Sequence, residues 1–394
     1  MYIELPCAVK LVLEKLNNAG YEAYVVGGCV RDSLMGMAPY DWDIATSATP
    51  REMQAVFADH RTIETGLKHG TLAVVIEDIP MEITTFRVEG YYSDGRHPDQ
   101  VVFSRNVTED LKRRDFTINA MAYHPISGVI DLFNGKSDVD RGILRCVGDP
   151  QKRFEEDALR ILRALRFASA LDFVIEEKTA AALHRLFPAL QCVSRERIAA
   201  ELCKLLCGKA AQRIAVEYVD VLSFLLPPLC KATDFHLLSA VAPSPAYRLA
   251  ALFWQSDVSI ETLSLIMREL RLDNHTVRSV LLLHSCREMP HTEQRQWLRI
   301  LNRLDAELTW VYLALCEADE TVYELLKNLL NNRCCYKMSM LAVNGNDLMQ
   351  AGLCEGPMVG QLLQTLLEAV MDGLCLNQTD ALLSYAKAMK KPVL

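Results

Sequence analysis

Two aspartates stand one residue apart in the segment Asp41-Trp42-Asp43-Ile44. If Trp42-Asp43-Ile44 forms a strand, both carboxylates project to the same face, because side chains alternate along a strand. Two carboxylates on one face repel each other unless a cation lies between them, and Mg²⁺ is commonly bound by one or two carboxylates together with substrate phosphates. The pair therefore predicts a catalytic metal site at Asp41 and Asp43.

A glycine pair precedes these aspartates, in Gly27-Gly28-Cys29-Val30-Arg31-Asp32, directly after a predicted strand over 22–26. A Gly-Gly turn ahead of a short helix exposes backbone N–H groups that can bind phosphate. Taken singly, an Asp-x-Asp or a Gly-Gly is more often an ordinary turn. In combination they indicate metal-assisted phosphoryl chemistry on a nucleotide.

A second group of candidate residues lies where a single helix is expected over 150–171. On that helix Asp157 and Arg160 are neighbours three residues apart, opposite an apolar stripe. Arg163 and Arg166 continue the row of charges. Taken alone, such a row is most simply a surface ladder with an ion pair between Asp157 and Arg160.

The same two side chains could instead read a nucleotide base. A carboxylate only accepts hydrogen bonds, and a guanidinium only donates them. Cytosine and adenine each present an amino donor beside a ring-nitrogen acceptor, so Asp157 and Arg160 together match either base, whereas uracil and guanine present the reverse order. A buried mismatch leaves polar groups unpaired at a cost of about 1–3 kcal/mol each. Such a helix would select CTP and ATP without a template.

A third group is Arg113-Arg114-Asp115, which the apolar residues Phe116, Ile118 and Met121 should anchor. Adjacent arginines are often merely solvated, so a nucleotide contact and a surface position are both possible interpretations. Ahead of this group, the segment 91–99 has the composition of a loop.

Composition limits the class of protein. The chain has 394 residues and 51% hydrophobic content, which allows two to four domains with sizeable cores. No apolar run approaches the ~18–20 residues of a membrane span, and the N-terminus does not resemble a secretory signal. The 13 cysteines are scattered without a Cys-x-x-Cys pair, which argues against a zinc site and against a disulfide framework. We therefore expect a cytoplasmic protein.

The formal net charge of −8 is unevenly distributed along the chain. Residues 151–213 carry 12 Lys and Arg against 8 Asp and Glu, whereas the segments before and after them are acidic. A local surface for an RNA backbone would give this pattern, but so would a helical region with solvated arginines.

The pattern of elements changes near residue 148. Before it, we expect strands over 22–26, 71–76 and 81–87, a helix over 5–19, and a second helix that starts at a Thr49–Glu52 capping box. After it the pattern is helical, with weak breaks at prolines 227–228 and 243–245 and at 344–346. The expected helices span 150–171, 178–190, 195–207, 210–225, 246–256, 259–271, 274–288, 292–303, 307–330 and 357–373.

Five motifs together resemble, in order and spacing, the class II (bacterial-type) CCA-adding tRNA nucleotidyltransferases and their poly(A) polymerase relatives. They are Gly27-Gly28-x-x-Arg31-Asp32, Asp41-x-Asp43, Arg113-Arg114-Asp115, Glu156-Asp157-x-x-Arg160 and Glu196-Arg197. The resemblance implies an α/β nucleotidyltransferase head of the polymerase-beta type followed by an all-α C-terminal region. The implied parts are a catalytic head over 1–147, a base-reading neck over 148–210, a body over 211–330 and a tRNA-binding tail over 331–394.

The resemblance also implies roles for single residues. The catalytic residues would be Asp41 and Asp43, as ligands of two Mg²⁺ ions, and Glu82 is a candidate third carboxylate. Asp94-Gly95-Arg96 resembles the flexible loop of enzymes that add the full CCA sequence. The implied nucleotide-binding residues are Gly28, Arg31, Arg114, Asp157, Arg160, Arg163 and Arg166.

The implied reaction is template-independent addition of C, C and A to the 3′ end of tRNA from CTP and ATP, with release of pyrophosphate. The expected partners are tRNA and these two nucleotides, with no membrane. A poly(A) polymerase, or an A-adding or CC-adding specialist of the same family, would keep nearly all the motifs. A catalytically silent RNA-binding protein is an alternative of another class, against which the intact pair Asp41 and Asp43 argues.

Overall fold

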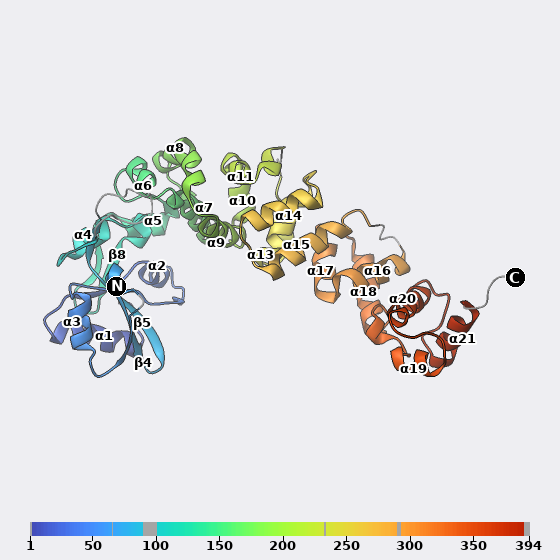
Figure 1. Ribbon diagram of the computed structural model, residues 1–394. Coiled ribbons are helices and arrows are strands. Elements are labelled where there is room, and N and C mark those ends of the chain that lie inside the picture. Colours follow the sequence, from blue (N-terminus) through green and yellow to red (C-terminus); the bar gives the residue numbers. More distant parts are fainter. Residues whose placement is uncertain (1, 65, 90–100, 232–233, 290–292, 390–394) are drawn as a thin grey trace. The chain divides into compact units, whose positions relative to one another are not determined.

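The computed structural model describes residues 2–64, 66–89, 101–231, 234–289 and 293–389 (Figure 1). The chain divides into two compact units, Met1–Cys230 and Lys231–Leu394. All strands found in the described residues lie in the first unit, and the second unit is helical. The predicted α/β region followed by an all-α region is confirmed, whereas the finer boundaries at 147, 210 and 330 stay predictions.

A mixed sheet of seven strands forms the centre of the first unit, in the order β3-β4-β5-β2-β1-β8-β9. Its middle strand β2 runs antiparallel to β1 and parallel to β5. The sheet strands are β1 Ala23–Val26, β2 Ile44–Thr46, β3 Arg61–Ile63, β4 Thr71–Ile76, β5 Ile79–Thr85, β8 Met121–His124 and β9 Gly128–Asp131. Two short pairs lie outside it, β6 Arg87–Glu89 with β7 Val101–Phe103, and β10 Ile143–Leu144 with β11 Val174–Ile175.

Helices surround this sheet and make up the rest of the chain. None of the described helices is both long and apolar enough to cross a membrane. In the first unit they are α1 Cys7–Asn18, α2 Gly28–Leu34, α3 Pro50–Val56, α4 Val107–Lys112, α5 Gly135–Arg141, α6 Pro150–Glu156, α7 Leu159–Leu171, α8 Glu177–Leu186, α9 Arg195–Leu206, α10 Ala211–Glu217 and α11 Val219–Leu225. In the second unit they are α12 Leu237–Ala240, α13 Pro245–Trp254, α14 Ile260–Glu269, α15 Asn274–Cys286, α16 Gln294–Leu304, α17 Ala306–Leu315, α18 Glu320–Asn331, α19 Gly345–Gln350, α20 Met358–Met371 and α21 Thr379–Met389. Short 3₁₀ turns are η1 Leu67–His69, η2 Thr117–Asn119, η3 Phe187–Cys192, η4 Pro227–Lys231 and η5 Met338–Met340.

The hairpin of β4 and β5 explains one shift from the predicted strands. The strand predicted over 71–76 is confirmed, but the next one starts and ends two residues before the predicted 81–87. The connection is a two-residue turn at Glu77 and Asp78, whose φ angles are 50° and 64°. Positive φ at both central residues matches the twist of a tight hairpin, so β5 can begin at once.

The first helices follow the predicted capping chemistry. The helix expected over 5–19 starts at Cys7 because Pro6 is its N-cap, with an extended ψ of 152°, and proline has no N–H to donate. In α3 the capping box is confirmed, since the Thr49 N–H donates to the Glu52 carboxylate at 2.7 Å.

The helix predicted over 150–171 is interrupted, and the structure has α6 and α7 instead. Asp157 lies between them with extended dihedral angles (φ −146°, ψ 103°), and its carboxylate accepts the N–H of Leu159 at 3.0 Å. Aspartate competes with the helical backbone through such local hydrogen bonds, which is why it favours helix ends. The prediction that Asp157 and Arg160 share one continuous helix is therefore wrong.

Three other predicted helices are also interrupted. The helix over 210–225 is broken at Tyr218, whose dihedral angles (φ −120°, ψ 37°) are not helical. The helix over 307–330 breaks before Asp319, whose carboxylate caps α18, and the helix over 178–190 ends as the 3₁₀ turn η3, which contains a proline. The predicted set lacks α12, α19 and α21.

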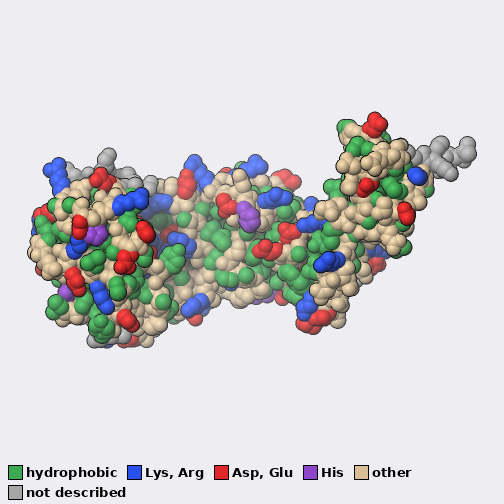
Figure 2. Space-filling model, turned by 90° about the horizontal axis from the view of Figure 1, so that it is seen from below, with side chains coloured by type: hydrophobic (Ala, Val, Ile, Leu, Met, Phe, Trp, Pro, Cys, Tyr) green, Lys and Arg blue, Asp and Glu red, His purple; other side chains and the backbone are tan. Residues whose placement is uncertain are grey.

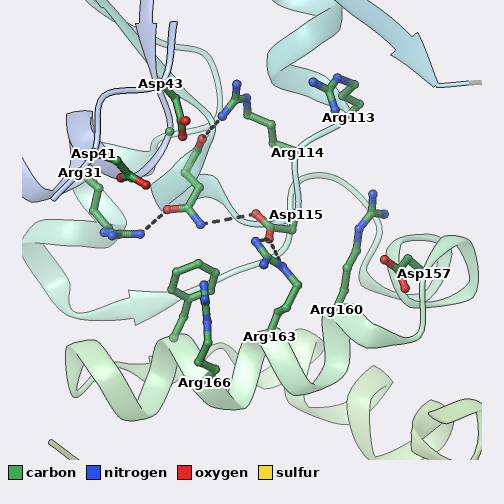
Figure 3. Close-up of a pocket in the computed structure, with 14 residues that line it drawn as sticks. Arg31, Asp41, Asp43, Arg113, Arg114, Asp115, Asp157, Arg160, Arg163 and Arg166 are labelled. Atoms are coloured by element: carbon green, nitrogen blue, oxygen red, sulfur yellow. Dashed lines mark hydrogen bonds and ion pairs between the residues drawn. The ribbon is translucent and has the colours of Figure 1, made fainter. Parts of the chain in front are cut away.

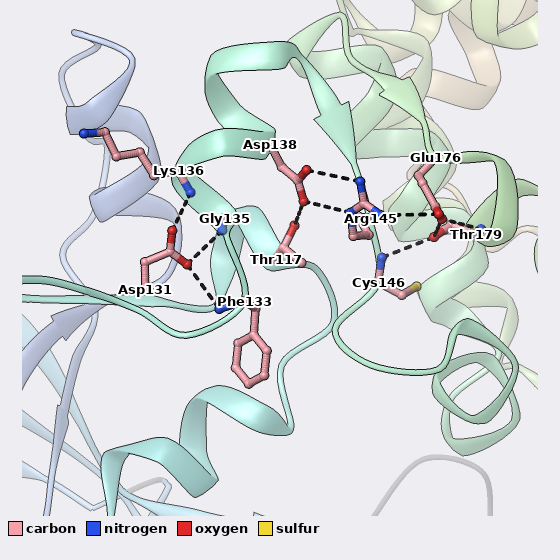
Figure 4. Close-up of polar contacts among 10 residues, drawn as sticks. All are labelled: Thr117, Asp131, Phe133, Gly135, Lys136, Asp138, Arg145, Cys146, Glu176 and Thr179. Atoms are coloured by element: carbon pink, nitrogen blue, oxygen red, sulfur yellow. Dashed lines mark hydrogen bonds and ion pairs between the residues drawn. The ribbon is translucent and has the colours of Figure 1, made fainter.

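A buried carboxylate joins distant segments of the first unit (Figure 4). Asp138 of α5 accepts a hydrogen bond from the Thr117 hydroxyl at 2.7 Å and pairs with Arg145 at 3.1 Å. Arg145 also pairs with Glu176, whose carboxylate caps α8. Because Thr117 closely follows Arg113-Arg114-Asp115, this network fixes the segment that carries these candidate residues.

Replacing Asp138 with alanine leaves the Thr117 hydroxyl and the Arg145 guanidinium without their buried acceptor. We expect the free energy of unfolding of the first unit to fall by about 2–3 kcal/mol, because an unsatisfied buried group carries its full desolvation cost. Urea denaturation followed by circular dichroism measures this change. Asp140→Ala on the same helix, where the side chain is exposed, is the control and should change stability by less than about 0.5 kcal/mol. Equal losses in both variants would contradict the role of Asp138.

Candidate active site

One cavity of about 580 Å³ in the first unit gathers the predicted residues (Figure 3). Its walls come from α2, from the segment before β2, from the stretch between α4 and η2, and from the start of α7. Of the residues predicted to bind metal or nucleotide, all but the candidate third carboxylate Glu82 line this cavity. The lining residues are Gly27, Gly28, Arg31, Asp41, Asp43, Arg113, Arg114, Asp115, Asn119, Asp157, Arg160, Arg163, Arg166 and Phe167.

The glycine pair forms the turn into α2, as the sequence predicted. Gly27 is the N-cap of this helix and has a φ of 80°, a conformation that glycine adopts without steric cost. A Cβ atom at Gly27 would lie 2.9 Å from Nη1 of Arg114. The missing side chain therefore allows an arginine from another segment to lie against the turn.

Asp41 and Asp43 both line the cavity, although the strand expected over 42–44 is wrong. The strand β2 begins at Ile44, so the aspartates lie in the segment that leads into it, although the Asp43 carbonyl still accepts the N–H of Val26 in β1 at 3.0 Å. Burial and the neighbouring charge of Asp41 raise the pKa of Asp43, while Arg114 opposes that shift. Two carboxylates that repel each other in this way gain from a shared cation.

The carboxylates of Asp41 and Asp43 fit a divalent cation that is also bound by the phosphates of a substrate. Within the described part of the chain, no three His, Cys, Asp or Glu side chains form a complete metal site. Mg²⁺ needs no such cage, because one or two carboxylates with phosphate oxygens and water complete its coordination. Glu82 lies on β5 next to Ile83, the register partner of Ile44, and its charge adds to the rise in the pKa of Asp43. Glu82 does not line the cavity, so its role as a third ligand stays a prediction.

A buried aspartate of α4 holds both adjacent arginines. The Asp110 carboxylate pairs with Nη2 of Arg113 at 2.8 Å and with Nη2 of Arg114 at 3.2 Å. Burial alone would raise the pKa of Asp110, but the two guanidinium groups hold it below its usual value. The arginine side chains are only 14% and 18% exposed, so the interpretation of the two arginines as merely solvated is wrong.

A chain of hydrogen bonds links α2 to α7 across the cavity (Figure 3). Nη1 of Arg31 donates to the Asn119 side-chain oxygen, and the Asn119 amide nitrogen donates to Asp115 at 3.5 Å. Asp115 in turn accepts two hydrogen bonds from Arg163, at 2.9 and 2.6 Å. Burial would raise the pKa of Asp115, but Arg163 holds it below its usual value.

The aromatic ring of Phe167 gathers three guanidinium groups. Their central carbons lie 3.9 Å (Arg166), 5.3 Å (Arg163) and 5.4 Å (Arg31) from the ring centroid, distances at which a cation is attracted to an aromatic face. Glu201 of α9 pairs with Arg166 at 3.1 Å and with Arg163 at 3.7 Å. The ring and the carboxylate together let like charges lie side by side.

Asp157 and Arg160 both face the cavity, each held by a further partner. The Asp157 carboxylate binds Arg197 of α9 at 2.8 Å in addition to the backbone of α7. Arg160 pairs with Glu156 at 2.5 Å. These contacts fix the orientation of an acceptor and of a donor at one wall of the cavity (Figure 3).

Comparisons with known proteins agree with this geometry. The family described as "Poly A polymerase head domain" matches residues 23–145, "Probable RNA and SrmB- binding site of polymerase A" matches 172–230, and "tRNA nucleotidyltransferase domain 2 putative" matches 245–386. The CCA-adding enzyme of Enterococcus faecalis is 37% identical over 391 residues, which cover 96% of this chain and 95% of that protein. The CCA-adding enzyme of Lactiplantibacillus plantarum is 38% identical over 400 residues, with the same coverage of both chains.

A solved structure is also similar over nearly the whole length. It is the Bacillus stearothermophilus CCA-adding enzyme in complex with CTP, with a TM-score of 0.75, 31% identity, and coverage of 97% of this chain and 96% of that chain. This chain belongs to the family of bacterial CCA-adding enzymes and poly(A) polymerases. It is a nucleotidyltransferase, and nucleotidyltransferases generally use a divalent metal ion.

Sequence reasoning about this nucleotidyltransferase missed four side chains that hold its cavity together. Asp110 could have been found, because it precedes Arg113 and Arg114 by three and four residues on a helix. Asn119 and Phe167 stand close to residues that were predicted, but nothing local marks their contacts. Glu201 reaches Arg166 from another helix, so only the fold reveals it. The loop segment Asp94-Gly95-Arg96 lies outside the described residues.

Asp110→Asn tests the support of the two arginines in this nucleotidyltransferase. We expect KM for the nucleotide to rise about tenfold, and stability to fall by about 2–3 kcal/mol, because two charged hydrogen bonds lose their anionic acceptor. Steady-state kinetics and urea denaturation measure the two effects. Glu109→Gln, the same chemical change at the neighbouring position of α4, is the control. If it raises KM as much, the effect is one of net charge only.

The lowered pKa of Asp110 determines how its contribution to the free energy of unfolding changes with pH. A carboxylate whose pKa is lower in the native state than in the unfolded state stabilises the fold at pH values above its unfolded pKa of about 3.9. This stabilisation is lost as the pH falls through the native pKa. The stability difference between the parent and Asp110→Asn should therefore be largest near neutral pH and shrink below about pH 4. A difference that grows on acidification would contradict this assignment.

Proposed function

We propose that this chain adds C, C and A to the 3′ end of tRNA, using CTP and ATP and releasing pyrophosphate. The observation that carries the proposal is that one cavity is lined both by the aspartate pair Asp41 and Asp43 and by Asp157 and Arg160. The first pair suits nucleotidyl transfer, and the second suits selection of C and A by the protein itself. An enzyme with both needs no template.

In the proposed reaction the 3′-hydroxyl oxygen of the RNA bonds to the α-phosphorus of the nucleotide, and the bond to pyrophosphate breaks. Asp41 and Asp43 would hold two Mg²⁺ ions, which would stabilise the charge at the α-phosphate and activate the attacking hydroxyl. The backbone of Gly28 and the guanidinium groups of Arg31 and Arg114 bind the triphosphate, and their fixed positions align it with the hydroxyl.

The charge of the cavity supports a triphosphate ligand. Six arginines and four aspartates line it, which leaves a formal charge of +2. A nucleoside triphosphate carries about four negative charges near neutral pH, so the excess of cations in the lining favours its binding.

Base selection in this proposal rests on hydrogen-bonding capacity that the two side chains retain. A carboxylate has about four lone-pair sites and a guanidinium has five N–H donors. Asp157 uses two of its sites for Leu159 and Arg197, so acceptor capacity remains for the amino group of C or A. Arg160 supplies the donor for the ring nitrogen, and Arg163 and Arg166 support the same wall.

The face drawn in Figure 2 offers the RNA partner no broad basic surface. On the face drawn in Figure 2, Lys and Arg side chains are interspersed with Asp and Glu over the described residues, and the formal net charge of the chain is −8. Recognition of tRNA by shape and by a few local backbone contacts is compatible with this distribution. The helical region is the proposed site of those contacts.

The decisive experiment incubates the chain with tRNA that lacks CCA and sizes the products on a gel. With CTP and ATP together we expect addition of three residues, with CTP alone two, and with ATP alone none. A long adenosine tail would instead identify a poly(A) polymerase, and stopping after C-C or adding only A to tRNA-CC would identify a specialist.

Two controls test the role of the metal ions in this experiment, substitution of the aspartates and removal of the metal. Asp41→Ala and Asp43→Ala should abolish addition of both C and A while tRNA binding stays within about threefold, because only the metal site is lost. Chelation by EDTA should do the same, and added Mg²⁺ should restore activity. Activity of either variant within about tenfold of the parent would exclude the proposed metal role.

Base selection is tested by Asp157→Asn, which keeps the size of the side chain and one acceptor oxygen. We expect the ratio of kcat/KM for CTP to that for UTP to fall by about ten- to a hundredfold, the equivalent of about 1.5–3 kcal/mol for a charged hydrogen bond. The exposed Glu155→Gln on α6 is the control. An unchanged ratio in a folded Asp157→Asn variant would mean that Asp157 only orients Arg197.

A further inference from the structure

Arg153 of α6 is a largely buried arginine that lies behind the wall of the active-site cavity. Its side chain is 15% exposed, and it is not among the residues that line the cavity. Its guanidinium donates to the backbone carbonyls of Lys112 at 3.0 Å, of Arg113 at 3.4 Å and of Val147 at 3.1 Å. Arg153 therefore joins α6 to the segment that carries the two adjacent arginines of the site.

The same guanidinium binds a carboxylate that also holds Arg160. Nη1 of Arg153 lies 2.8 Å from Oε2 of Glu156, and Nη1 of Arg160 lies 2.5 Å from the same oxygen. One negative charge is thus shared by two positive charges. Because a shared carboxylate neutralises neither cation completely, Arg160 keeps part of its charge for a ligand in the cavity.

The backbone of Arg153 holds Arg160 as well. Helix α6 ends at Glu156, so the carbonyl groups of its last turn lack partners within the helix. One of them, the Arg153 carbonyl, accepts a hydrogen bond from Nη1 of Arg160 at 3.1 Å. The end of a helix carries partial negative charge, which favours a cation there. Arg153 thus holds Arg160 in two ways, directly by its carbonyl and indirectly by its guanidinium through Glu156.

This arrangement predicts what the loss of the Arg153 guanidinium would change. Glu156 would no longer be tied, through Arg153, to the backbone at 112–113, and its charge would act on Arg160 alone. The closer pair could then shift and draw the Arg160 donors away from the cavity. Hydrogen bonds weaken steeply when their angles deviate, so a donor that must match one edge of a base needs a fixed position.

We propose that Arg153 is a positioning residue for base selection, which holds Glu156 so that Arg160 stays directed at the nucleotide base. This inference rests on the proposed function, in which Arg160 donates a hydrogen bond to the ring nitrogen of C or A. Arg153 lies outside the lining of the cavity, so its role is exerted through Glu156 and Arg160. The alternative is that Arg153 only attaches α6 to the backbone at 112–113.

The test replaces Arg153 with methionine in the full chain and supplies tRNA lacking CCA. We expect the ratio of kcat/KM for CTP to that for UTP to fall about three- to tenfold, because Arg160 loses its fixed orientation. Loss of a buried guanidinium should also lower Tm. A less stable enzyme, however, loses activity with both nucleotides equally, so the ratio separates positioning from a purely structural role.

Arg185→Met is the matched control. Arg185 of α8 also contacts α6, since its Nη2 donates to the Gln151 side chain at 2.7 Å, but it is exposed and lies outside the lining of the cavity. The ratio for this variant should stay within about twofold of the parent, as is usual for surface substitutions. A fall as large as that in Arg153→Met would mean that any loss of charge near α6 has this effect, and would overturn the inference.

A double variant tests whether Arg153 acts through Glu156. Glu156→Gln should lower the same ratio, because the shared carboxylate loses its charge. Arg153→Met/Glu156→Gln should lower it no further than the larger of the two single effects, since residues of one network are not additive. Losses that multiply in the double variant would show that Arg153 acts independently of Glu156, which contradicts the inference.

Asp157→Asn, measured in the same assay, separates this inference from the proposed function. An unchanged ratio in Arg153→Met overturns the inference, and if Asp157→Asn lowers the ratio, the proposed function stands. If the parent shows no preference for CTP over UTP, the proposed base selection fails first and the inference falls with it. A lower ratio in Arg153→Met, no further loss in the double variant and no loss in Arg185→Met together support the inference.

Discussion

The carboxylate of Asp115 is the interaction on which the active-site cavity depends. It lies between the sheet part of the first unit and helix α7, and it binds Arg163 directly and Arg31 through Asn119. Without it, Arg163 and Asn119 would lose the carboxylate that joins the wall at α2 to the wall at α7. The buried network around Asp138 fixes the same segment from the other side, through Thr117.

The lining of the cavity carries six arginines against four aspartates, and carboxylates and a ring around it limit the cost of this excess. Asp110 binds two of the arginines, Glu201 binds two others, and the ring of Phe167 lies against three guanidinium groups. Because each arginine is held by a neighbour, the donors are positioned before the nucleotide arrives. Preorganised charges of this kind stabilise a developing negative charge without reorganisation at the moment of reaction.

The second unit shows the opposite distribution of charge. It is helical and net acidic, with 15 Lys and Arg against 18 Asp and Glu over 231–394. Many of its charged side chains are paired across or within helices, as Arg299 with Asp372 and Lys327 with Glu324.

The sequence by itself determined the residue types of the site and most of the elements that carry them. Glycine at a turn, aspartates one residue apart and arginines at helical spacing have local physical requirements, and these were enough to predict α2, β1, β4, the capping box of α3 and nine residues that line one cavity. The families matched by the chain confirm the nucleotidyltransferase head and the helical C-terminal region.

Only the tertiary structure decided how those residues are held. The apolar periodicity of 150–171 is not interrupted at Asp157, so it predicts one helix. The Asp157 side chain, however, accepts the backbone N–H of Leu159, and the predicted helix is divided there into α6 and α7. Arg197 then binds Asp157 across 40 residues of sequence, Glu201 binds Arg166, and Asp115 binds Arg163 across 48. Ion pairs between segments far apart in sequence leave no local pattern, because each partner alone resembles an ordinary charged residue on a helix. Their pairing follows from packing, and packing is a property of the whole fold.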